Sequence, residues 1–505
     1  MAPTSTTKIQ IFHDNTRSAP LQTSSSSKEA LPLSEFMQSA VPSLYSPHSR
    51  FTPTRLLPGG IAQTIYSNAG LATAARTIKY SRKSIMLPDG GNIALDFTPR
   101  MAFESACDTT PIVIVLHGAL GGSHAPYVQA ALEPLTRPKV QGGSGLRAVV
   151  FNFRGCNGSR LTSPRLYHPR MTDDLRSIIL YLRSLLPAAP LYALGFSMGA
   201  SLLSCYLAET GESSAISAAF CVSNVFDYTG CTAELDSGAF ISRRILNPVI
   251  GFGHRKIVAA NKDAFFANMD EEDCKSLSLQ DRKDALSKIL WNPSITMSSF
   301  TEDLVVPFEG YASISDFLQD TSCKDVLKNI RVPLVCLNAQ DDPLMKGSLL
   351  PYHEAAANPY VVLAVTAHGG HIGWYTRDQG RMTQWFTKPI CEYFAGLAKL
   401  NLPARISPTA LDADVSGICH QDGRLSVGFK EVSGTYIRSI GLKTSPGRPI
   451  TISAQLASSK TIVLHRQFID FIRLLLSFIF VAIAWHTQSR MNTASRGGWP
   501  LLRSL

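Results

Sequence analysis

The chain has 505 residues, of which 45% are apolar and 17% are charged. This composition excludes a wholly disordered chain, a collagen-like repeat and a small disulfide-bonded scaffold. The net charge of +10 comes from the ends, because residues 1–80 carry +4 and residues 401–505 carry +7, which leaves residues 81–400 at −1. We therefore expect no nucleic-acid partner for the folded part of the chain.

The ten cysteines are scattered, with no C-x-x-C pair and no Cys/His cluster at zinc spacing. Residues 1–50 are rich in Ser, Thr and Pro and lack the basic start and apolar stretch of a signal peptide. We expect this segment to be mobile. We also expect an intracellular protein, either cytoplasmic or on the cytosolic face of a membrane.

Residues 77–97 predict a hairpin with a turn at Asp89-Gly-Gly. Further along the chain, short apolar runs alternate with sequence of helical periodicity. The apolar runs are 111–117, 148–153, 191–196, 332–338 and 360–365, and the helical segments include 127–132 and 172–182. Continuous apolar runs suit strands that are buried on both faces of a parallel sheet, so the alternation predicts an open α/β sheet.

Changes in composition and hydrophobic pattern divide the chain into regions. We expect an N-terminal extension over 1–75, partly disordered, and one folded domain over 76–400. Helical, charge-mixed sequence over 227–320 predicts an insertion in that domain. After it we expect a linker over 401–460, an apolar segment over 461–490 and a tail over 491–505.

The apolar segment is shorter than a bilayer requires. Its core is 468–485, but the uncharged run is only 474–485, against roughly 20 residues for a membrane span. Three interpretations stay open: a membrane anchor, an amphipathic helix lying on a membrane or on the protein, and a poorly ordered tail.

One motif indicates a nucleophile. Gly195-Phe-Ser-Met-Gly199 follows an apolar strand and leads into a helical segment. A strand, a sharp turn with small residues on both sides and a helix are what a nucleophile elbow requires, and they would expose the hydroxyl of Ser197. The alternative is an ordinary glycine-rich turn with a passive serine.

A serine hydroxyl needs a base, which in turn is oriented by a carboxylate. Asp341 and Asp342 follow the predicted strand 332–338, and His368 and His371 follow the strand 360–365. We choose Asp342, which directly precedes Pro343, as the acid, and we expect the other aspartate to cap the turn. We choose His371, with glycines on both sides, as the base.

A glycine-rich loop follows the first buried strand as His117-Gly-Ala-Leu-Gly-Gly122. A loop at this point can deliver a backbone N–H group to an oxyanion. The N–H of Ala119 or Leu120 would then complete an oxyanion hole with the N–H of Met198.

Five longer motifs resemble the AB hydrolase superfamily, AB hydrolase 4 family, over about residues 50–400. They are His117-Gly-Ala-Leu-Gly-Gly-Ser-His, Phe151-Asn-Phe-Arg-Gly-Cys-Asn-Gly-Ser159, Thr162-Ser-Pro-Arg-Leu-Tyr-His168, Gly195-Phe-Ser-Met-Gly199 and Gly369-Gly-His-Ile-Gly373. That family includes medium-chain fatty acid ethyl ester synthase/esterases and membrane-associated phospholipases. The resemblance implies an α/β-hydrolase fold, a mostly parallel sheet flanked by helices with a helical lid insertion. It also implies Ser197, Asp342 and His371 as nucleophile, acid and base, and carboxylic ester hydrolysis.

Three further features keep two interpretations each. His168 and Asp173 have the H-x4-D spacing linked with acyltransferases, but Asp173 and Asp174 are also placed to cap a helix. Arg154 and Arg165 suit either an anionic substrate or internal ion pairs. The aromatic and Met side chains of the insertion suit either a lid over an acyl pocket or a small core of its own; they are Phe265, Phe266, Met269, Trp291 and Phe300.

The expected function is a serine esterase or lipase that cleaves esters of medium-chain or lipid acyl groups through an acyl-enzyme. One alternative is an acyltransferase that makes esters from acyl-CoA and an alcohol, and another is an inactive hydrolase fold used for binding. The substrate partner would be an ester, an acyl-CoA or a lipid. No metal or cofactor motif is present in the sequence, so we expect none.

Overall fold

The computed structural model describes residues 7–21, 30–68, 78–100, 108–266, 277–405 and 428–432. Contacts divide the chain into two units, Met1–Leu442 and Lys443–Leu505. The second unit, which holds the apolar segment 468–485, lies outside the described residues, as does most of the predicted linker. Among the described helices, none has the length and apolar character needed to cross a bilayer.

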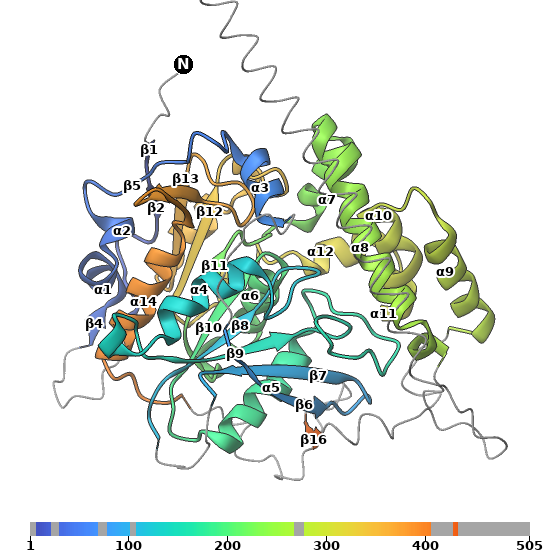
Figure 1. Ribbon diagram of the computed structural model, residues 1–505, viewed down its shortest axis with the longest axis horizontal. Helices are drawn as coiled ribbons and strands as arrows, with labels where there is room; N and C mark the ends of the chain where they lie inside the picture. Colours follow the sequence, from blue (N-terminus) through green and yellow to red (C-terminus); the bar gives the residue numbers. More distant parts are fainter. Residues whose placement is uncertain are drawn as a thin grey trace, which may run out of the picture. The chain divides into compact units, whose positions relative to one another are not determined.

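The first unit is built on a ten-stranded sheet with the order β16-β6-β7-β9-β8-β10-β11-β12-β13-β2 (Figure 1). The six strands from β9 to β13 run parallel, and β7, β6, β16 and β2 are added antiparallel at the two sides. Their bounds are β2 (Gln10–Phe12), β6 (Ser81–Met86), β7 (Asn92–Thr98), β8 (Ile112–Leu116), β9 (Arg147–Asn152), β10 (Leu191–Phe196), β11 (Ile216–Val222), β12 (Leu334–Ala339), β13 (Val361–Thr366) and β16 (Lys430–Val432).

Helices and short strands complete the described part. The helices are α1 (Leu33–Ala40), α2 (Pro42–Tyr45), α3 (Gly60–Asn68), α4 (Pro126–Thr136), α5 (Thr172–Leu185), α6 (Met198–Thr210), α7 (Tyr228–Ser237), α8 (Asn247–Ala260), α9 (Leu279–Trp291), α10 (Met297–Phe300), α11 (Val306–Glu309), α12 (Ile314–Thr321), α13 (Tyr352–Ala356) and α14 (Thr387–Lys399). Three small ribbons pair β1 (Thr7–Lys8) with β5 (Arg50–Phe51), β3 (Pro20–Leu21) with β4 (Leu31–Pro32), and β14 (Tyr375–Asp378) with β15 (Arg381–Gln384).

The apolar runs of the sequence correspond to strands covered on both faces. In β8, Ile114 packs into one core cluster with helices α5 and α6, whereas its neighbours Val113 and Val115 pack into a second cluster with α4 and α14. Alternate side chains point to opposite faces of a strand, so a strand between two helical layers is apolar at every position. The predicted mostly parallel sheet flanked by helices, and the predicted hairpin of β6 and β7, are confirmed. The strand β11 was not predicted.

The N-terminal extension differs from the expected mobile segment. Its strand β2 pairs with β13 at the edge of the main sheet, and Phe36 and Met37 of α1 are buried in the second core cluster. The Phe36 ring contacts the ring of Tyr393 on α14 at 5.9 Å between centroids. The expectation of mobility over 1–50 is therefore wrong for the described residues 7–21 and 30–50, because their apolar side chains cover the sheet.

The predicted insertion at 227–320 holds the helices α7 to α12, which gather beside the sheet in Figure 1. Phe265 and Phe300 are buried in a third cluster that is formed mainly by the insertion itself. Trp291 is 83% exposed and Phe266 is 39% exposed, while Met269 lies outside the described residues. Of the two interpretations of these side chains, the buried pair fits a core of the insertion.

Candidate active site

The chain turns sharply at Ser197, between β10 and α6. Ser197 has φ +52° and ψ −122°, a conformation that few residues with a side chain adopt. The glycines on both sides make room for this turn. A Cβ at Gly195 would lie 2.6 Å from the Cα of Ala200, and a Cβ at Gly199 would lie 2.4 Å from the carbonyl oxygen of His117. Both contacts are with backbone, so neither glycine can carry a side chain without moving the elbow.

Three predicted side chains meet at this turn. The Nε2 atom of His371 lies 2.7 Å from the Oγ of Ser197, and its Nδ1 atom lies 2.8 Å from the Oδ2 of Asp342. All three residues are buried, with exposures of 8% for Ser197, 4% for His371 and 1% for Asp342. Because a carboxylate only accepts, Nδ1 of His371 carries a hydrogen, and Nε2 is the ring atom that faces the serine hydroxyl.

In the loop after β12, which carries the acid, the two aspartates have different hydrogen-bond partners. The Oδ1 of Asp342 accepts the N–H groups of Leu344 and Met345, at 2.8 and 3.1 Å. Asp341 accepts the N–H of Gly370 at 2.9 Å and lies 3.1 Å from Nδ1 of His368. The expectation that the aspartate other than Asp342 caps the turn is wrong, because Asp342 itself holds the turn and Asp341 joins the two loops. Burial raises the pKa of Asp341.

The loop that carries His371 is held by residues far away in the sequence. The N–H of His371 donates to Oγ1 of Thr64 at 2.8 Å, and the N–H of Ile372 donates to Oγ of Ser223 at 2.9 Å. Thr64 belongs to α3 in the N-terminal extension, and Ser223 follows β11. Neither residue was predicted from the sequence, because no local motif marks either of them.

The glycine-rich loop after β8 lies against the serine. A Cβ at Gly118 would come within 3.2 Å of the Cβ of Ser197. The His117 ring fixes this loop, because Nδ1 bonds the Gly118 carbonyl at 2.7 Å and Nε2 accepts the Phe153 N–H at 3.2 Å. Burial lowers the pKa of His117 to about 3, so its ring is neutral at pH 7.

The candidate oxyanion donors differ in whether their N–H groups already have a hydrogen-bond acceptor. Met198 is the first residue of α6, so its N–H has no acceptor within the helix. The N–H of Leu120 donates to the hydroxyl of Tyr167 at 3.0 Å, and Leu120 has φ +65°. Of the two loop residues that the sequence left open, Leu120 therefore already has an acceptor, which favours Ala119.

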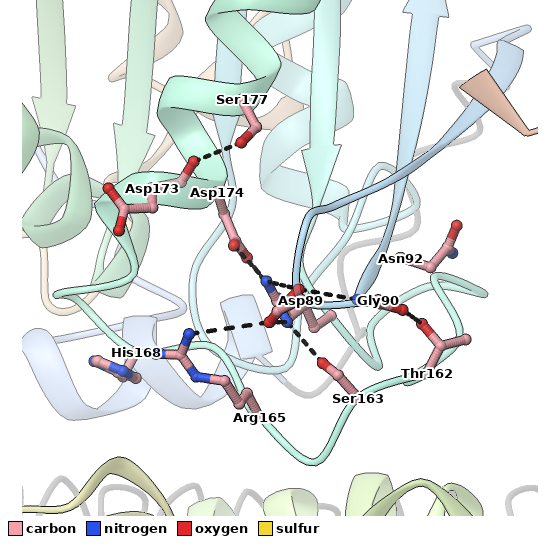
Figure 2. Close-up of polar contacts among 12 residues, drawn as sticks. Asp89, Gly90, Asn92, Thr162, Ser163, Arg165, His168, Asp173, Asp174 and Ser177 are labelled. Carbon is pink, nitrogen blue, oxygen red and sulfur yellow. Dashed lines mark hydrogen bonds and ion pairs between the residues drawn. The ribbon is translucent and has the colours of Figure 1, made fainter. Parts of the chain in front are cut away.

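Arg154 lies at the centre of a buried ionic network (Figure 2). Its guanidinium bonds both carboxylate oxygens of Asp174, at 2.7 and 2.6 Å, and both oxygens of Asp89, at 2.5 and 3.1 Å. It also donates to the Ser163 hydroxyl at 2.8 Å. Burial by itself would raise the pKa of Asp89, but the charge and hydrogen bonds of Arg154, the N–H of Gly91 and the charge of Arg165 together outweigh burial and hold that pKa below its usual value. Of the two interpretations of Arg154, the internal ion pair is the one observed.

The residues of the H-x4-D motif do not act together. Figure 2 shows the His168 ring well apart from the Asp173 carboxylate. His168 faces Glu309 of α11 at 3.4 Å, whereas Asp173 pairs with Arg176 at 3.4 Å. Arg165 pairs with the same Glu309 at 2.7 Å. The two contacts of Glu309, with His168 and with Arg165, connect the insertion to the body.

The expected capping role of the two aspartates that begin α5 is wrong. The N-cap residue of α5 is Met171, and it makes no side-chain cap. Asp174 instead binds the Arg154 guanidinium through both oxygens, and Asp173 pairs with Arg176. The two carboxylates therefore form ion pairs, one with the body and one with the next turn of α5, and do not cap the helix.

A hollow of about 630 Å³ opens beside the acid loop. Side chains from α3, the start of the insertion and the loop after β12 line it, among them Ile61, Ser242, Gln340, Lys346 and Tyr352. Ser197 is not among its lining residues. Within the described residues no group of three His, Cys, Asp or Glu side chains is placed to hold a metal ion.

Comparison with known proteins identifies the family of the chain. The profile of a family described as alpha/beta hydrolase fold matches residues 111–378. The chain is 29% identical to a monoacylglycerol lipase of Saccharomyces cerevisiae over 67% of this chain and 78% of that protein. It is 28% identical to phospholipase ABHD3 of Mus musculus over 60% of this chain and 68% of that one. It is 26% identical to medium-chain fatty acid ethyl ester synthase/esterase 2 of Saccharomyces cerevisiae over 74% and 91%.

The ionic network makes a prediction for stability. Replacing Arg154→Met leaves the Asp89 and Asp174 carboxylates buried without a counterion, which should lower the free energy of unfolding by about 3–5 kcal/mol in urea titrations. The control Arg137→Met removes the half-buried i,i+4 pair with Glu133 and should leave the midpoint closer to that of the wild type than Arg154→Met does. If Arg154→Met keeps full stability but loses substrate affinity, Arg154 serves the substrate and the structural assignment is wrong.

Proposed function

Because the chain belongs to the alpha/beta hydrolase fold family, we propose that it is a serine hydrolase that cleaves carboxylic esters of medium-chain or lipid acyl groups. One observation carries the proposal: the unbroken line of hydrogen bonds from Asp342 through His371 to the Ser197 hydroxyl. Its relatives are named as a lipase, a phospholipase and an ester synthase/esterase, which supports lipid esters as the substrate class.

The first half of the reaction uses the proton path of the site. His371 Nε2 takes the proton of Ser197 as Oγ attacks the ester carbonyl carbon, and Asp342 stabilises the imidazolium that forms. The backbone N–H groups of Met198 and Ala119 bind the negative oxygen of the tetrahedral intermediate. When the intermediate collapses, the C–O bond to the alcohol breaks, the alcohol oxygen takes the proton from His371, and Ser197 keeps the acyl group.

The second half repeats these steps with a new nucleophile. His371 removes a proton from water, the hydroxide oxygen attacks the acyl carbon, and the acid leaves as Ser197 recovers its proton. An alcohol in place of water yields a new ester, so transfer is the second candidate activity. A specific comparison favours keeping it, because one relative that spans 74% of this chain is named both as a synthase and as an esterase.

Hydrolysis of p-nitrophenyl esters from C2 to C16 tests the proposal. Wild-type protein should show a maximum at one chain length, and Ser197→Ala should lower kcat by at least about a thousandfold, because the nucleophile is lost. Ethanol in the same assay should divert part of the product to ethyl ester, measured by gas chromatography. Equal, near-background rates from both proteins would contradict the serine esterase.

The two neighbouring aspartates provide a matched test of the acid. Asp342→Asn should lower kcat by about 10⁴-fold, because the amide cannot hold the reactive tautomer of His371. Asp341→Asn removes the same charge one residue away, where its partner is His368, and should keep kcat within about tenfold of the wild type. Equal losses in both variants, or the larger loss in Asp341→Asn, would show that Asp342 is not the orienting acid.

A further inference from the structure

The oxyanion loop is connected to the insertion through one buried hydroxyl. Tyr167 lies in the body, on the loop before α5, and its Oη accepts the N–H of Leu120 at 3.0 Å. On its other side the same hydroxyl lies 3.4 Å from Nε2 of His254 on α8. The Tyr167 ring is held in place by stacking on Phe153 at 5.3 Å between ring centroids. One hydroxyl thus bridges the loop beside Ser197 and a helix of the insertion.

The proton positions along this bridge follow from its two ends. Nδ1 of His254 lies 2.9 Å from the carbonyl oxygen of Ile250, which can only accept, so Nδ1 carries a hydrogen. Burial lowers the pKa of His254 to about 4, so the ring is neutral at pH 7 and its Nε2 is an acceptor. The hydroxyl of Tyr167 therefore accepts from Leu120 and is placed to donate to His254, and the Cys156 thiol is a further neighbour of the same hydroxyl.

Packing brings the helix to the loop at the same place. A Cβ at Gly253, next to His254, would lie 2.3 Å from Cδ1 of Leu120, so α8 and the Leu120 side chain are in close contact here and a larger residue at 253 would displace that side chain. Leu120 itself has φ +65°, a backbone conformation that costs free energy unless its surroundings hold it. The hydrogen bond to Tyr167 and the contact with α8 both act on this residue.

We propose that Tyr167 and His254 are positioning residues for the oxyanion hole. Through these two side chains, helix α8 of the insertion holds Leu120 in place. Leu120 in turn orients the N–H of the preceding residue, Ala119, toward the reacting carbonyl. This inference rests on the proposed serine hydrolase function. In it, the docked position of the insertion is part of transition-state stabilisation. Because the two residues act through Leu120 in this proposal, we expect their loss to act on kcat and to leave ground-state binding unchanged.

The test uses full-length protein, p-nitrophenyl octanoate and five variants. Tyr167→Phe should lower kcat about tenfold with KM unchanged, which is less than the loss of an oxyanion donor itself, since Ala119 stays present but misplaced. His254→Leu should give a smaller loss of kcat, also with KM unchanged. The double variant should be no slower than Tyr167→Phe alone, because His254 acts only through Tyr167.

The matched control is Tyr192→Phe. Tyr192 is fully buried in the core and its hydroxyl has no hydrogen-bond partner, so its removal should leave kcat at the wild-type value. Near-UV circular dichroism and thermal melts establish that each variant is folded. If Tyr167→Phe does not fold, His254→Leu carries the test by itself, and a wild-type kcat in that variant overturns the proposal.

The remaining outcomes separate this proposal from the function it rests on. Wild-type kcat in Tyr167→Phe, a change in KM alone, or independent, multiplicative losses in the double variant each overturn the positioning role while the esterase stands. Steady-state release of p-nitrophenol by the wild type, lost in Ser197→Ala, is the readout for the esterase. Without that difference the esterase fails, and the positioning role fails with it.

Discussion

The backbone conformation of Ser197 is the constraint on which the site depends. Its φ of +52° is held from both sides, because its N–H donates to the carbonyl of Val222 on β11 and its carbonyl accepts the N–H of Ala200 on α6, each at 2.9 Å. Such a conformation persists only where the surroundings over-determine it. The central strands and the first turn of α6 supply that support, and the serine hydroxyl is left at the carboxyl ends of the strands.

The groups that act on this serine come from distant parts of the chain and are fixed by buried polar contacts. The loop with His371 depends on Thr64, 307 residues earlier, so the N-terminal extension is part of the site's support. The glycine-rich loop depends on the neutral ring of His117 within it and on Tyr167. Farther out, Arg154 ties the β6–β7 turn to α5. Burial of such a polar or charged group lowers the free energy of unfolding little while the group has its partner, and much more when the partner is removed.

Much of the fold could be predicted because it has a local signal. Strands covered on both faces appear in the sequence as apolar runs. Ser197, Asp342 and His371 each follow such a run, and the structure brings them together beyond the carboxyl ends of β10, β12 and β13. What could not be predicted depends on pairing across the fold. Asp341 and Asp342 are adjacent, so the local sequence does not distinguish their partners. Asp174 lies where a helix cap is expected, and only the folded chain shows that it binds Arg154. No residue near Thr64 in the sequence indicates that it contacts the loop of His371. The burial of Phe36 likewise depends on α14, which is remote in sequence.

The most direct test of the account is to locate the nucleophile covalently. A fluorophosphonate that carries an alkyl chain is incubated with the protein, and the modified residue is identified by peptide mass spectrometry. The account predicts one adduct, on Ser197, formed rapidly in the wild type and slowly in His371→Ala, because the base no longer takes the proton. An unmodified Ser197 in protein that hydrolyses esters, or an adduct on another serine, would contradict it.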